Sequence, residues 1–515
     1  MTYSATLLAL LEYHLTKDPK TSITDAALNK KLRLPELNFH AQILQQKLNT
    51  CRLQEKSIVH FIGPNSLPLI AVYCGILYNK WVPVGSNYTA PLAELIRNIN
   101  ETDSEGLAIS RDLWNKFGPS IKCPKLKVVF IYELTDVEEF SIDIEHVEYD
   151  GEEVIKENLD NVDWMYMTSG STGTPKAIMI DHKSIFGLYS QMNMMRLSLP
   201  APLMFITCQP FCNIGGSFSF WSCMYNSASY VIIEGFNEKV YLDCYKNYQC
   251  NYLVGTSAIL NSLSKYPKLD EYNFATTFGI EVVGSKPDDN VIRILKKRTG
   301  ISDRAVMKTS YASSESFTSH YFFCPISNIP DRYPKAIENV KCKIINPETG
   351  TDLKANEIGE ICINSPYLMR GYYKDKAKTN SVLSKDGWYR MGDLGSLDEE
   401  DRLLVVGRLK EVVKYRGFSV HTLELESILQ NHDAVSLCAV IGESHDEHEE
   451  IPVAFVVKKY EVKEDELLDF VNEKVTDYKR LHKIYFLQQM PLNNGMKLNK
   501  PALKSIVSRN CVKIN

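Results

Sequence analysis

The chain has 515 residues, of which 44% are hydrophobic and 23% charged, the composition of an ordinary globular protein. Such a length exceeds what one hydrophobic core usually serves, so at least two domains are expected. A formal net charge of −5 gives no electrostatic case for nucleic-acid binding, which needs a basic face. Thirteen cysteines without a Cys-x-x-Cys pair argue against a disulfide scaffold and predict mostly buried, reduced thiols.

Targeting and membrane signals are weak throughout the chain. Residues 6–12 carry no basic leader and meet a charge too early for a signal peptide. Residues 69–78 are apolar but only about half as long as a membrane span. The last residues differ from the Ser-Lys-Leu peroxisomal address. The expectation is a cytoplasmic protein without a transmembrane segment.

Strand and helix signals alternate from residue 57 onward. Residues 1–55 look helical and partly amphipathic, with apolar side chains at helical spacing around Ala41, Leu44 and Leu48. An apolar helix is expected after the first strand, and another helix at 91–99. Strands are predicted at 57–62, 82–84, 107–109 and 128–131. This alternation is typical of an α/β fold with doubly wound parallel sheets.

The next stretch, residues 168–176, has an unusual composition. It reads Thr-Ser-Gly-Ser-Thr-Gly-Thr-Pro-Lys, which places five hydroxyls, two glycines and a lysine between two apolar segments. Glycines let backbone N–H groups converge on one point, and the hydroxyls add further donors. Such a loop suits a polyphosphate. The alternative is a Ser/Gly-rich surface turn. The length of the hydroxyl run and the apolar segments directly on both sides of it argue against that alternative.

This loop differs from the common P-loop of nucleotide-binding proteins. The P-loop needs Gly-Lys followed by Ser or Thr at the start of a helix. Here Pro175 precedes Lys176, no hydroxyl residue follows the lysine, and residues 177–180 read as a strand. The loop is therefore predicted to join two strands as a flap, without a helix dipole aimed at the phosphates.

The α/β rhythm resumes after the flap and then changes. Helices are expected near 237–247, 257–264 and 288–298, and strands at 203–207, 230–233 and 280–284. Short strands around 340–365 predict a β-rich subdomain. A charged turn at 398–402 precedes the strand 403–407. Turn chemistry and typical domain sizes place the boundary at 407, giving an N-terminal domain 1–407 and a small, mobile α+β C-terminal domain 408–515.

Six separated stretches occur in an order that resembles the adenylate-forming superfamily. They are residues 167–176, 309–315, 359–361, 387–395, 407–417 and 491–497. The resemblance is strongest to the branch of acyl-CoA synthetases, 4-coumarate–CoA ligases and firefly luciferases, and it spans nearly the whole chain. In that superfamily a carboxylate attacks the α-phosphate of ATP, giving an acyl-adenylate and pyrophosphate. A thiol, usually of coenzyme A, then takes the acyl group.

The resemblance implies a nucleotide site made from several of these stretches. The flap would hold the β- and γ-phosphates through Thr168, Ser169, Gly170, Ser171, Thr172, Gly173 and Lys176. The adenine side would be lined by Gly284, Ser285, Lys286, Pro287, Thr309, Ser310, Tyr311 and Ala312, with Tyr311 stacked on the base. Ser314 would touch the α-phosphate. Asp393 would accept both ribose hydroxyls, and Arg408 would add a ribose contact.

The reaction brings two anions together, so it requires positive charge at the phosphates. Two unit charges about 4 Å apart interact by roughly 4 kcal/mol at an effective dielectric of about 20. The resemblance assigns the Mg²⁺ ligand to Glu315 and the main catalytic charge to Lys497. Lys410 would be the hinge between two poses of the small domain, and Lys414 would face the site in the thioester-forming pose. The candidate catalytic residues are Lys497, Lys176, Glu315 and Lys414.

Several positions depart from the family pattern. Ala177 and Ala312 replace glycines, Met496 replaces the glycine before Lys497, and Lys286 replaces a small residue. Asn213 stands where the family has a histidine, and an asparagine cannot become cationic. Together with Ile214 and Gly215 it is assigned to the acid-binding pocket. The substitutions leave every implied phosphate, metal and ribose ligand in place.

The expected function is ATP-dependent activation of a fatty or aromatic acid, followed by transfer of the acyl group to coenzyme A. The expected cofactors are ATP, Mg²⁺ and coenzyme A, and the protein is expected to be a monomer or homodimer. A luciferase-type oxygenase shares every adenylation residue. A catalytically weak adenylate-binding protein would account for the substitutions. Both alternatives remain open, and the acid is not identified, because residues 317–335 diverge from the family.

Overall fold

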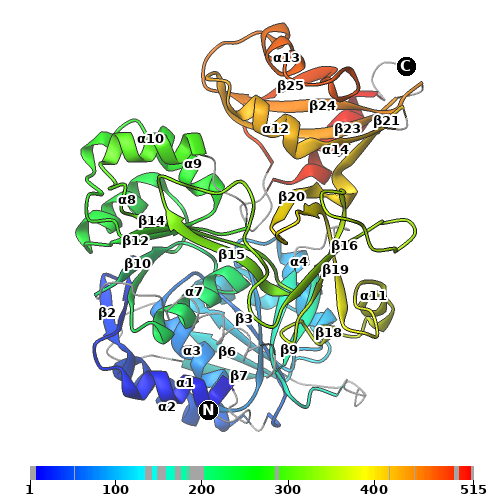
Figure 1. Ribbon diagram of the computed structural model, residues 1–515. Coiled ribbons are helices and arrows are strands. Elements are labelled where there is room, and N and C mark those ends of the chain that lie inside the picture. Colours follow the sequence, from blue (N-terminus) through cyan, green and yellow to red (C-terminus); the bar gives the residue numbers. More distant parts are fainter. Residues whose placement is uncertain are drawn as a thin grey trace. The chain divides into compact units, whose positions relative to one another are not determined.

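The computed structural model describes residues 7–51, 53–133, 142–147, 158–168, 175–181, 184, 202–284, 289–416, 418–445, 447–491 and 498–511. The chain divides into two compact units. Unit 1 comprises Met1–Pro330, Ile337–Val340 and Asn364–Gly387, and unit 2 comprises Asp331–Ala336, Lys341–Ile363 and Trp388–Asn515. Figure 1 colours them along the sequence. The domain boundary placed at residue 407 remains a prediction.

Unit 1 contains two eight-stranded sheets with parallel centres and antiparallel edges. The first has the order β18(Gly371–Tyr372), β9(Lys176–Asp181), β8(Val162–Thr168), β4(Val82–Ser86), β3(Ile58–Ile62), β5(Gly106–Ser110), β6(Val128–Tyr132), β7(Ile142–His146). The second has the order β15(Phe317–Pro325), β14(Val306–Ser313), β13(Gly279–Val282), β12(Tyr252–Gly255), β10(Met204–Thr207), β11(Ser229–Ile232), β1(Ser22–Asp25), β2(Lys30–Arg33).

Helices connect these strands in the alternation that the sequence predicts. They are α1(Leu7–Lys17), α2(Leu34–Asn49), α3(Leu67–Tyr78), α4(Leu92–Glu101), α5(Arg111–Phe117), α7(Ile214–Tyr225), α8(Glu238–Asn247), α9(Ser257–Lys265), α10(Asp289–Thr299) and α11(Lys376–Val382). The predicted α/β class and its doubly wound sheets are confirmed, and the predicted strand segments of this unit coincide with observed strands to within a few residues.

The core between the sheets is built around α3. All 12 of its residues are buried, as expected for a helix that is apolar on every side. Its partner α2 contributes Ala41, Leu44 and Leu48, each at most 1% exposed, so the predicted helical spacing is confirmed. The two helices approach closely at Gly75, where an added Cβ would lie 3.3 Å from Leu44.

One prediction for the N-terminal segment is wrong. Residues 22–33 were expected to be helical, but they form the antiparallel hairpin β1–β2. Strand β1 also pairs in parallel with β11, with Ile23 opposite Tyr230. Strand β11 lies about two hundred residues later in the chain than β1. All four residues of β1 are buried. Long-range pairing therefore overrides the local helical pattern here.

Unit 2 contains two smaller sheets, in agreement with the predicted β-rich and α+β regions. A four-stranded sheet has the order β16(Lys341–Ile345), β17(Gly359–Asn364), β19(Trp388–Leu397), β20(Leu403–Arg408). A five-stranded sheet contains β22(Phe418–His421), β21(Val412–Tyr415), β24(Glu449–Lys458), β23(Val435–His445) and β25(Lys483–Leu487). Its helices are α12(Thr422–Gln430), α13(Glu464–Asn472) and α14(Lys500–Cys511), shown in Figure 1.

The five-stranded sheet is covered on both faces because its side chains alternate. Cys438 and Val440 belong to a cluster with Leu425 of α12 and Leu467 of α13. Ala439 and Ile441 belong to a second cluster, with Leu503 and Val507 of α14. Successive residues of a strand point to opposite faces, so one strand supplies both clusters.

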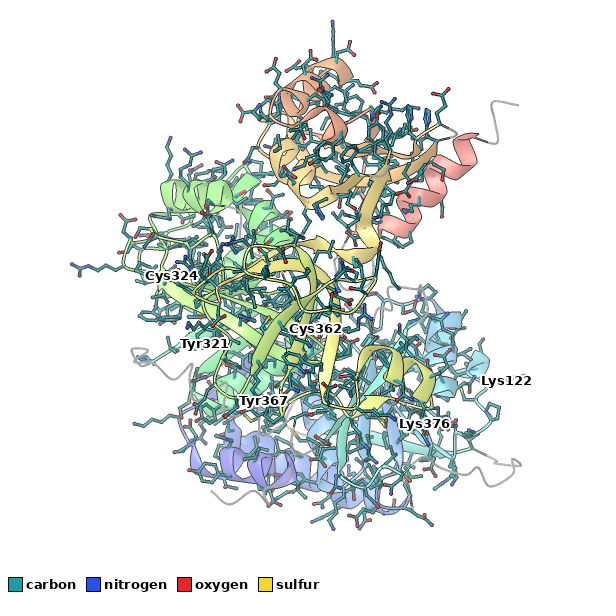
Figure 2. All side chains as sticks on the ribbon, turned by 45° about the vertical axis from the view of Figure 1, so that its right-hand side comes forward. Lys122, Tyr321, Cys324, Cys362, Tyr367 and Lys376 are labelled. Atoms are coloured by element: carbon teal, nitrogen blue, oxygen red, sulfur yellow. The ribbon has the colours of Figure 1, made fainter. Side chains whose placement is uncertain are left out.

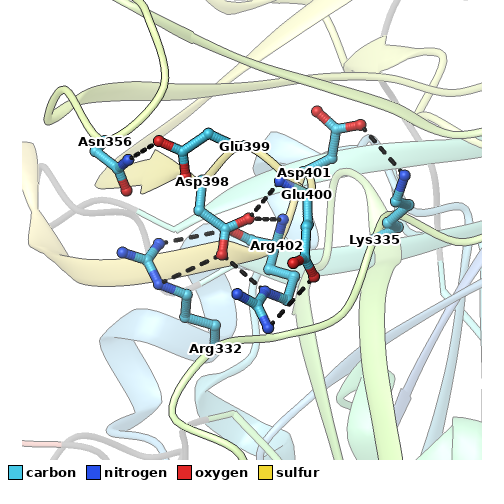
Figure 3. Close-up of polar contacts among 8 residues, drawn as sticks. All are labelled: Arg332, Lys335, Asn356, Asp398, Glu399, Glu400, Asp401 and Arg402. Carbon is cyan, nitrogen blue, oxygen red and sulfur yellow. Dashed lines mark hydrogen bonds and ion pairs between the residues drawn. The ribbon is translucent and has the colours of Figure 1, made fainter.

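The predicted charged turn at 398–402 stabilises the four-stranded part of unit 2 (Figure 3). The carboxylate of Asp398 lies 2.7 Å from Nε of Arg402 and 3.9 Å from Nε of Arg332. Asn356 donates a hydrogen bond to Glu399 over 2.8 Å. These contacts hold the β19–β20 connection against segments 331–336 and 341–363.

Most cysteine side chains are buried, as their number and spacing predict. The cysteines from Cys51 to Cys438 are free, and all of these but Cys324 and Cys342 are buried. Cys324 and Cys362 are labelled in Figure 2. Across the ranges given above, every helix is too short or too polar to pass through a membrane.

Candidate active site

The flap connects two neighbouring antiparallel strands, as predicted. The last residue pair of β8 and β9 is Thr168 opposite Lys176, and the Thr168 hydroxyl donates to the Lys176 carbonyl over 3.2 Å. Both ends of the loop are therefore fixed by strand pairing. The implied phosphate ligands between them, Ser169, Gly170, Ser171, Thr172 and Gly173, lie outside the described residues.

The flap lysine is held on the side of β18 and α11. Its Nζ lies 3.3 Å from Oδ2 of Asp375 and 5.4 Å from the centroid of the Tyr372 ring. Asp375 is the N-cap of α11 and accepts the backbone N–H of Lys378 over 2.8 Å. This backbone bond, and after it the Lys176 ammonium, keep the pKa of Asp375 below its ordinary value. Asp375 and Tyr372 thus orient the ammonium group of Lys176.

Tyr372 connects this lysine to Glu315. Its hydroxyl donates to Oε1 of Glu315 over 3.1 Å. The main chain makes a second link, because the N–H of Met369 donates to the Glu315 carbonyl over 2.7 Å. Since β18 pairs with β9, with Tyr372 opposite Ile178, one short strand brings the flap and the β14–β15 turn together. Lys176 and Glu315 therefore belong to one local site.

The implied adenine residues lie at the carboxyl ends of β13 and β14, where open α/β sheets usually bind ligands. Thr309 pairs with Val282, and its hydroxyl donates to the Val282 carbonyl over 3.0 Å. Gly284 follows β13 with a φ of +84°, a conformation that favours glycine. Tyr311 is 8% exposed, and its carbonyl accepts the Ser319 hydroxyl over 3.2 Å. Ser285, Lys286 and Pro287 are outside the described residues.

The end of β14 is irregular where the other candidates lie. The register with β15 shifts between Tyr311 and Ala312, and Ala312 is exposed. Ser310 and Ser314 are partly exposed. A bulge of this kind turns side chains out of the regular alternation, which is common beside active sites.

The residues assigned to the acid pocket begin α7. Asn213 is the N-cap residue of this helix, and Ile214 and Gly215 are its first two residues. An added Cβ at Gly215 would lie 3.9 Å from Cγ1 of Val283, which directly precedes Gly284. The first turn of α7 therefore lies beside the end of β13, next to the implied adenine segment.

Unit 2 carries the remaining candidates. Asp393 and Arg408 lie opposite each other on β19 and β20, and Nε of Arg408 is 2.9 Å from Oδ1 of Asp393. The Asp393 side chain is 9% exposed and that of Arg408 is 53% exposed. Lys410 lies in a short 3₁₀ turn, η3(Leu409–Glu411). Nζ of Lys414 lies 3.0 Å from the Ser419 hydroxyl, and Lys497 is outside the described residues.

Glu315 suits a Mg²⁺ ion that binds together with the nucleotide, as opposed to one held by a cage of protein ligands. Among the residues described in this structure, no group of three or more His, Cys, Asp or Glu side chains could form a metal cage. Magnesium commonly binds through one or two carboxylates together with the phosphates of the nucleotide. With Oε1 of Glu315 bonded to Tyr372, Oε2 suits an ion that arrives with ATP.

Tyr372 and Asp375 were missed by the sequence motifs. Strand β18 has only 2 residues, so it gives no periodic signal. Its pairing with β9 joins positions almost two hundred residues apart, which a local pattern cannot reveal. The available signal was the glycine before Tyr372. Gly371 has a φ of +151°, and an added Cβ would lie 2.9 Å from Thr379.

Comparison with known proteins supports the same interpretation. The family model for AMP-binding enzymes matches residues 25–373, and that for the AMP-binding enzyme C-terminal domain matches residues 424–497. The chain is 26% identical over 479 residues to 4-coumarate:CoA ligase 1 of Petunia hybrida, covering 89% of this chain and 86% of the relative. It is 28% identical over 368 residues to a 4-coumarate–CoA ligase of Pinus taeda, covering 68% and 66%.

Solved structures show the same fold. ATP-bound MatB from Rhodopseudomonas palustris matches with a TM-score of 0.81 at 21% identity, over 96% of this chain and 98% of MatB. The anthranilate CoA ligase AuaEII in complex with anthranoyl-AMP matches with a TM-score of 0.84 at 18% identity, over 98% and 99%. With more than half of its length matched by one family model, the chain belongs to the adenylate-forming family of AMP-binding enzymes.

Proposed function

We propose that the protein is an ATP-dependent acid–thiol ligase that makes an acyl-CoA from a fatty or aromatic carboxylic acid. The observation that carries the proposal is the joining of the flap lysine, Lys176, to Glu315 through Tyr372. It places a cation and a candidate metal ligand at the two ends of one tyrosine side chain, in a family of AMP-binding enzymes. The named relatives include 4-coumarate–CoA ligases, which supports coenzyme A as the acceptor.

In the first step, a carboxylate oxygen of the acid attacks the α-phosphorus of ATP, and the bond to pyrophosphate breaks. Under this proposal Lys176 and the flap bind the leaving pyrophosphate. Lys497 is the proposed cation that offsets the mutual repulsion of the α-phosphate and the carboxylate. Glu315 would hold Mg²⁺, which when bound supplies further positive charge to the phosphate oxygens.

Other residues bind the parts of ATP that do not react. Tyr311 stacks on adenine beside Gly284, and Asp393 accepts the ribose hydroxyls next to Arg408. In the second step the sulfur of coenzyme A attacks the acyl carbonyl, and AMP leaves. Lys410 is the proposed hinge and Lys414 the proposed lysine of this step. We also propose domains 1–407 and 408–515, a monomeric or homodimeric state, and the cytoplasm as the location.

Exchange of labelled pyrophosphate into ATP tests the first step. The exchange should depend on added acid, with a panel that covers fatty and aromatic acids. Lys497→Ala should slow it by about 10²–10³, the usual loss when one such donor is removed. A separate assay for the acyl-CoA tests the second step.

Three results would contradict the proposal. No exchange with any acid of the panel, together with tight ATP binding, would favour a weak adenylate-binding protein. An unchanged exchange rate in Lys497→Ala would show that Lys497 is not the catalytic lysine. Light emission with a luciferin, ATP and O₂, without acyl-CoA formation, would favour a luciferase-type oxygenase.

A further inference from the structure

Tyr372, the last residue of β18, and Tyr373, which follows it, point their side chains in opposite directions. Tyr372 bonds to Glu315 over 3.1 Å, and Tyr373 bonds to Oδ2 of Asp103 over 3.0 Å. Both residues are 7% exposed. Successive side chains of an extended segment point to opposite sides, so Tyr372 faces the candidate site while Tyr373 faces away from it.

The backbone of this segment is fixed independently of the two hydroxyls. Gly371 and Tyr372 pair with Met179 and Ile178 of β9. The N–H of Tyr373 donates to the Ala177 carbonyl over 2.8 Å. These bonds keep the Tyr372 ring in place when the hydroxyl is removed, so the effect of the hydroxyl can be measured alone.

The two ends of the Tyr372 side chain serve different partners. The ring centroid lies 5.4 Å from Nζ of Lys176, within the range in which an aromatic face attracts a cation. The hydroxyl binds Oε1 of Glu315 and carries no charge, so it orients the carboxylate without neutralising it. A carboxylate that is oriented but still fully anionic suits a divalent cation.

We propose that Tyr372 is a positioning residue for Mg²⁺ and the triphosphate of ATP, acting through Glu315 and Lys176. The proposal rests on the function proposed above, and it adds a residue that the sequence motifs do not contain. Loss of a group that orients a metal ligand typically weakens metal affinity by about 10- to 100-fold. The hydroxyl of Tyr372 should therefore control the requirement for the metal.

The test compares Tyr372→Phe with Tyr373→Phe, which removes the hydroxyl of the next, equally buried residue. In the exchange assay, Tyr372→Phe should raise the Mg²⁺ concentration needed for half-maximal rate by about 10-fold or more. The rate at saturating Mg²⁺ should remain close to that of the unmodified protein. Tyr373→Phe should leave the Mg²⁺ requirement unchanged, even if both variants lower the thermal midpoint.

A binding measurement makes the result independent of turnover. Mn²⁺ binding in the presence of ATP, followed by electron paramagnetic resonance, should weaken by about 10-fold in Tyr372→Phe alone. Tyr372→Leu, which also lacks the ring, should in addition weaken ATP binding measured by calorimetry. If no acid supports exchange but Mn²⁺ binding still weakens in Tyr372→Phe, the ligase proposal fails and this inference stands.

The inference is overturned by either of two results. One is Mn²⁺ binding by Tyr372→Phe equal to that of the unmodified protein. The other is an equal loss in Tyr372→Phe and Tyr373→Phe, which would show a general effect of disturbing the segment around β18.

Discussion

The carboxylates of Glu315 in unit 1 and Asp393 in unit 2 are held in contrasting ways. Glu315 accepts a hydrogen bond from the neutral hydroxyl of Tyr372 over 3.1 Å. Asp393 faces the guanidinium of Arg408 over 2.9 Å. A neutral donor orients a carboxylate and leaves its charge intact, whereas a guanidinium offsets that charge. The first arrangement suits a bound cation, and the second suits neutral hydroxyl groups such as those of a ribose.

The largest effect should follow from removing the charge of Glu315. Glu315→Gln keeps an oxygen that can accept the Tyr372 hydroxyl, but it loses the anion proposed to bind Mg²⁺. Because a metal contributes several kcal/mol of charge stabilisation, the exchange rate should fall by about 10²–10³. Glu271→Gln, at an exposed carboxylate of unit 1, is the control and should keep its activity. A loss below about 3-fold in Glu315→Gln would argue against the cation role.

A smaller effect is expected at Asp393. Asp393→Asn keeps one acceptor oxygen for a hydroxyl, so KM for ATP should rise by about 10-fold while kcat changes little. The free energy of unfolding should change by less than about 1 kcal/mol, because the partner Arg408 is 53% exposed. Steady-state kinetics and denaturant unfolding measure the two quantities. If Asp393→Asn costs as much exchange activity as Glu315→Gln, the contrast between the two sites is wrong.

A pH series measures the contribution of two buried histidines of unit 1 to stability. Burial lowers the pKa of His60 and of His320 to about 3, from an ordinary value of 6.5. Between these values the unfolded chain binds more protons than the folded one, so stability is present above pH 6.5 and is lost as the pH falls. Each histidine should contribute about 1.4 kcal/mol per pH unit in that window.

Denaturant unfolding at pH 7, 6 and 5 measures this loss. His320→Gln should remove the share of His320 from the pH slope and leave that of His60. An unchanged slope in the variant would show that His320 does not cause it.

The sequence predicts those parts of the molecule that depend on neighbouring residues. Apolar runs and their turns place most strands, and the apolar segments on both sides of the flap predict the two strands that it joins. The predicted charged turn at 398–402 does connect β19 and β20, but the opposition of Asp393 and Arg408 on these strands was not predicted.

The remaining features depend on contacts between distant segments. Strand β1 pairs with β11, and β18 pairs with β9, each across about two hundred residues. The first pairing turns an apparently helical segment into a hairpin, and the second supplies Tyr372 and Asp375 to the site. No periodicity within either segment specifies its partner, so the arrangement becomes visible only in the folded chain.

The contact between Lys176 and Asp375 has a consequence for the energetics of ATP binding. With an anionic partner 3.3 Å away and a side chain 25% exposed, the ammonium has already given up part of its hydration shell. Arrival of the triphosphate would then exchange one anion for another at Lys176, instead of capturing a fully hydrated cation. Such an exchange leaves Asp375 to be stabilised by the N–H of Lys378, which it already accepts as the cap of α11. Asp375 thus takes the position of a phosphate at Lys176 before ATP binds, and the N–H of Lys378 stabilises the same carboxylate once ATP has displaced it from the lysine.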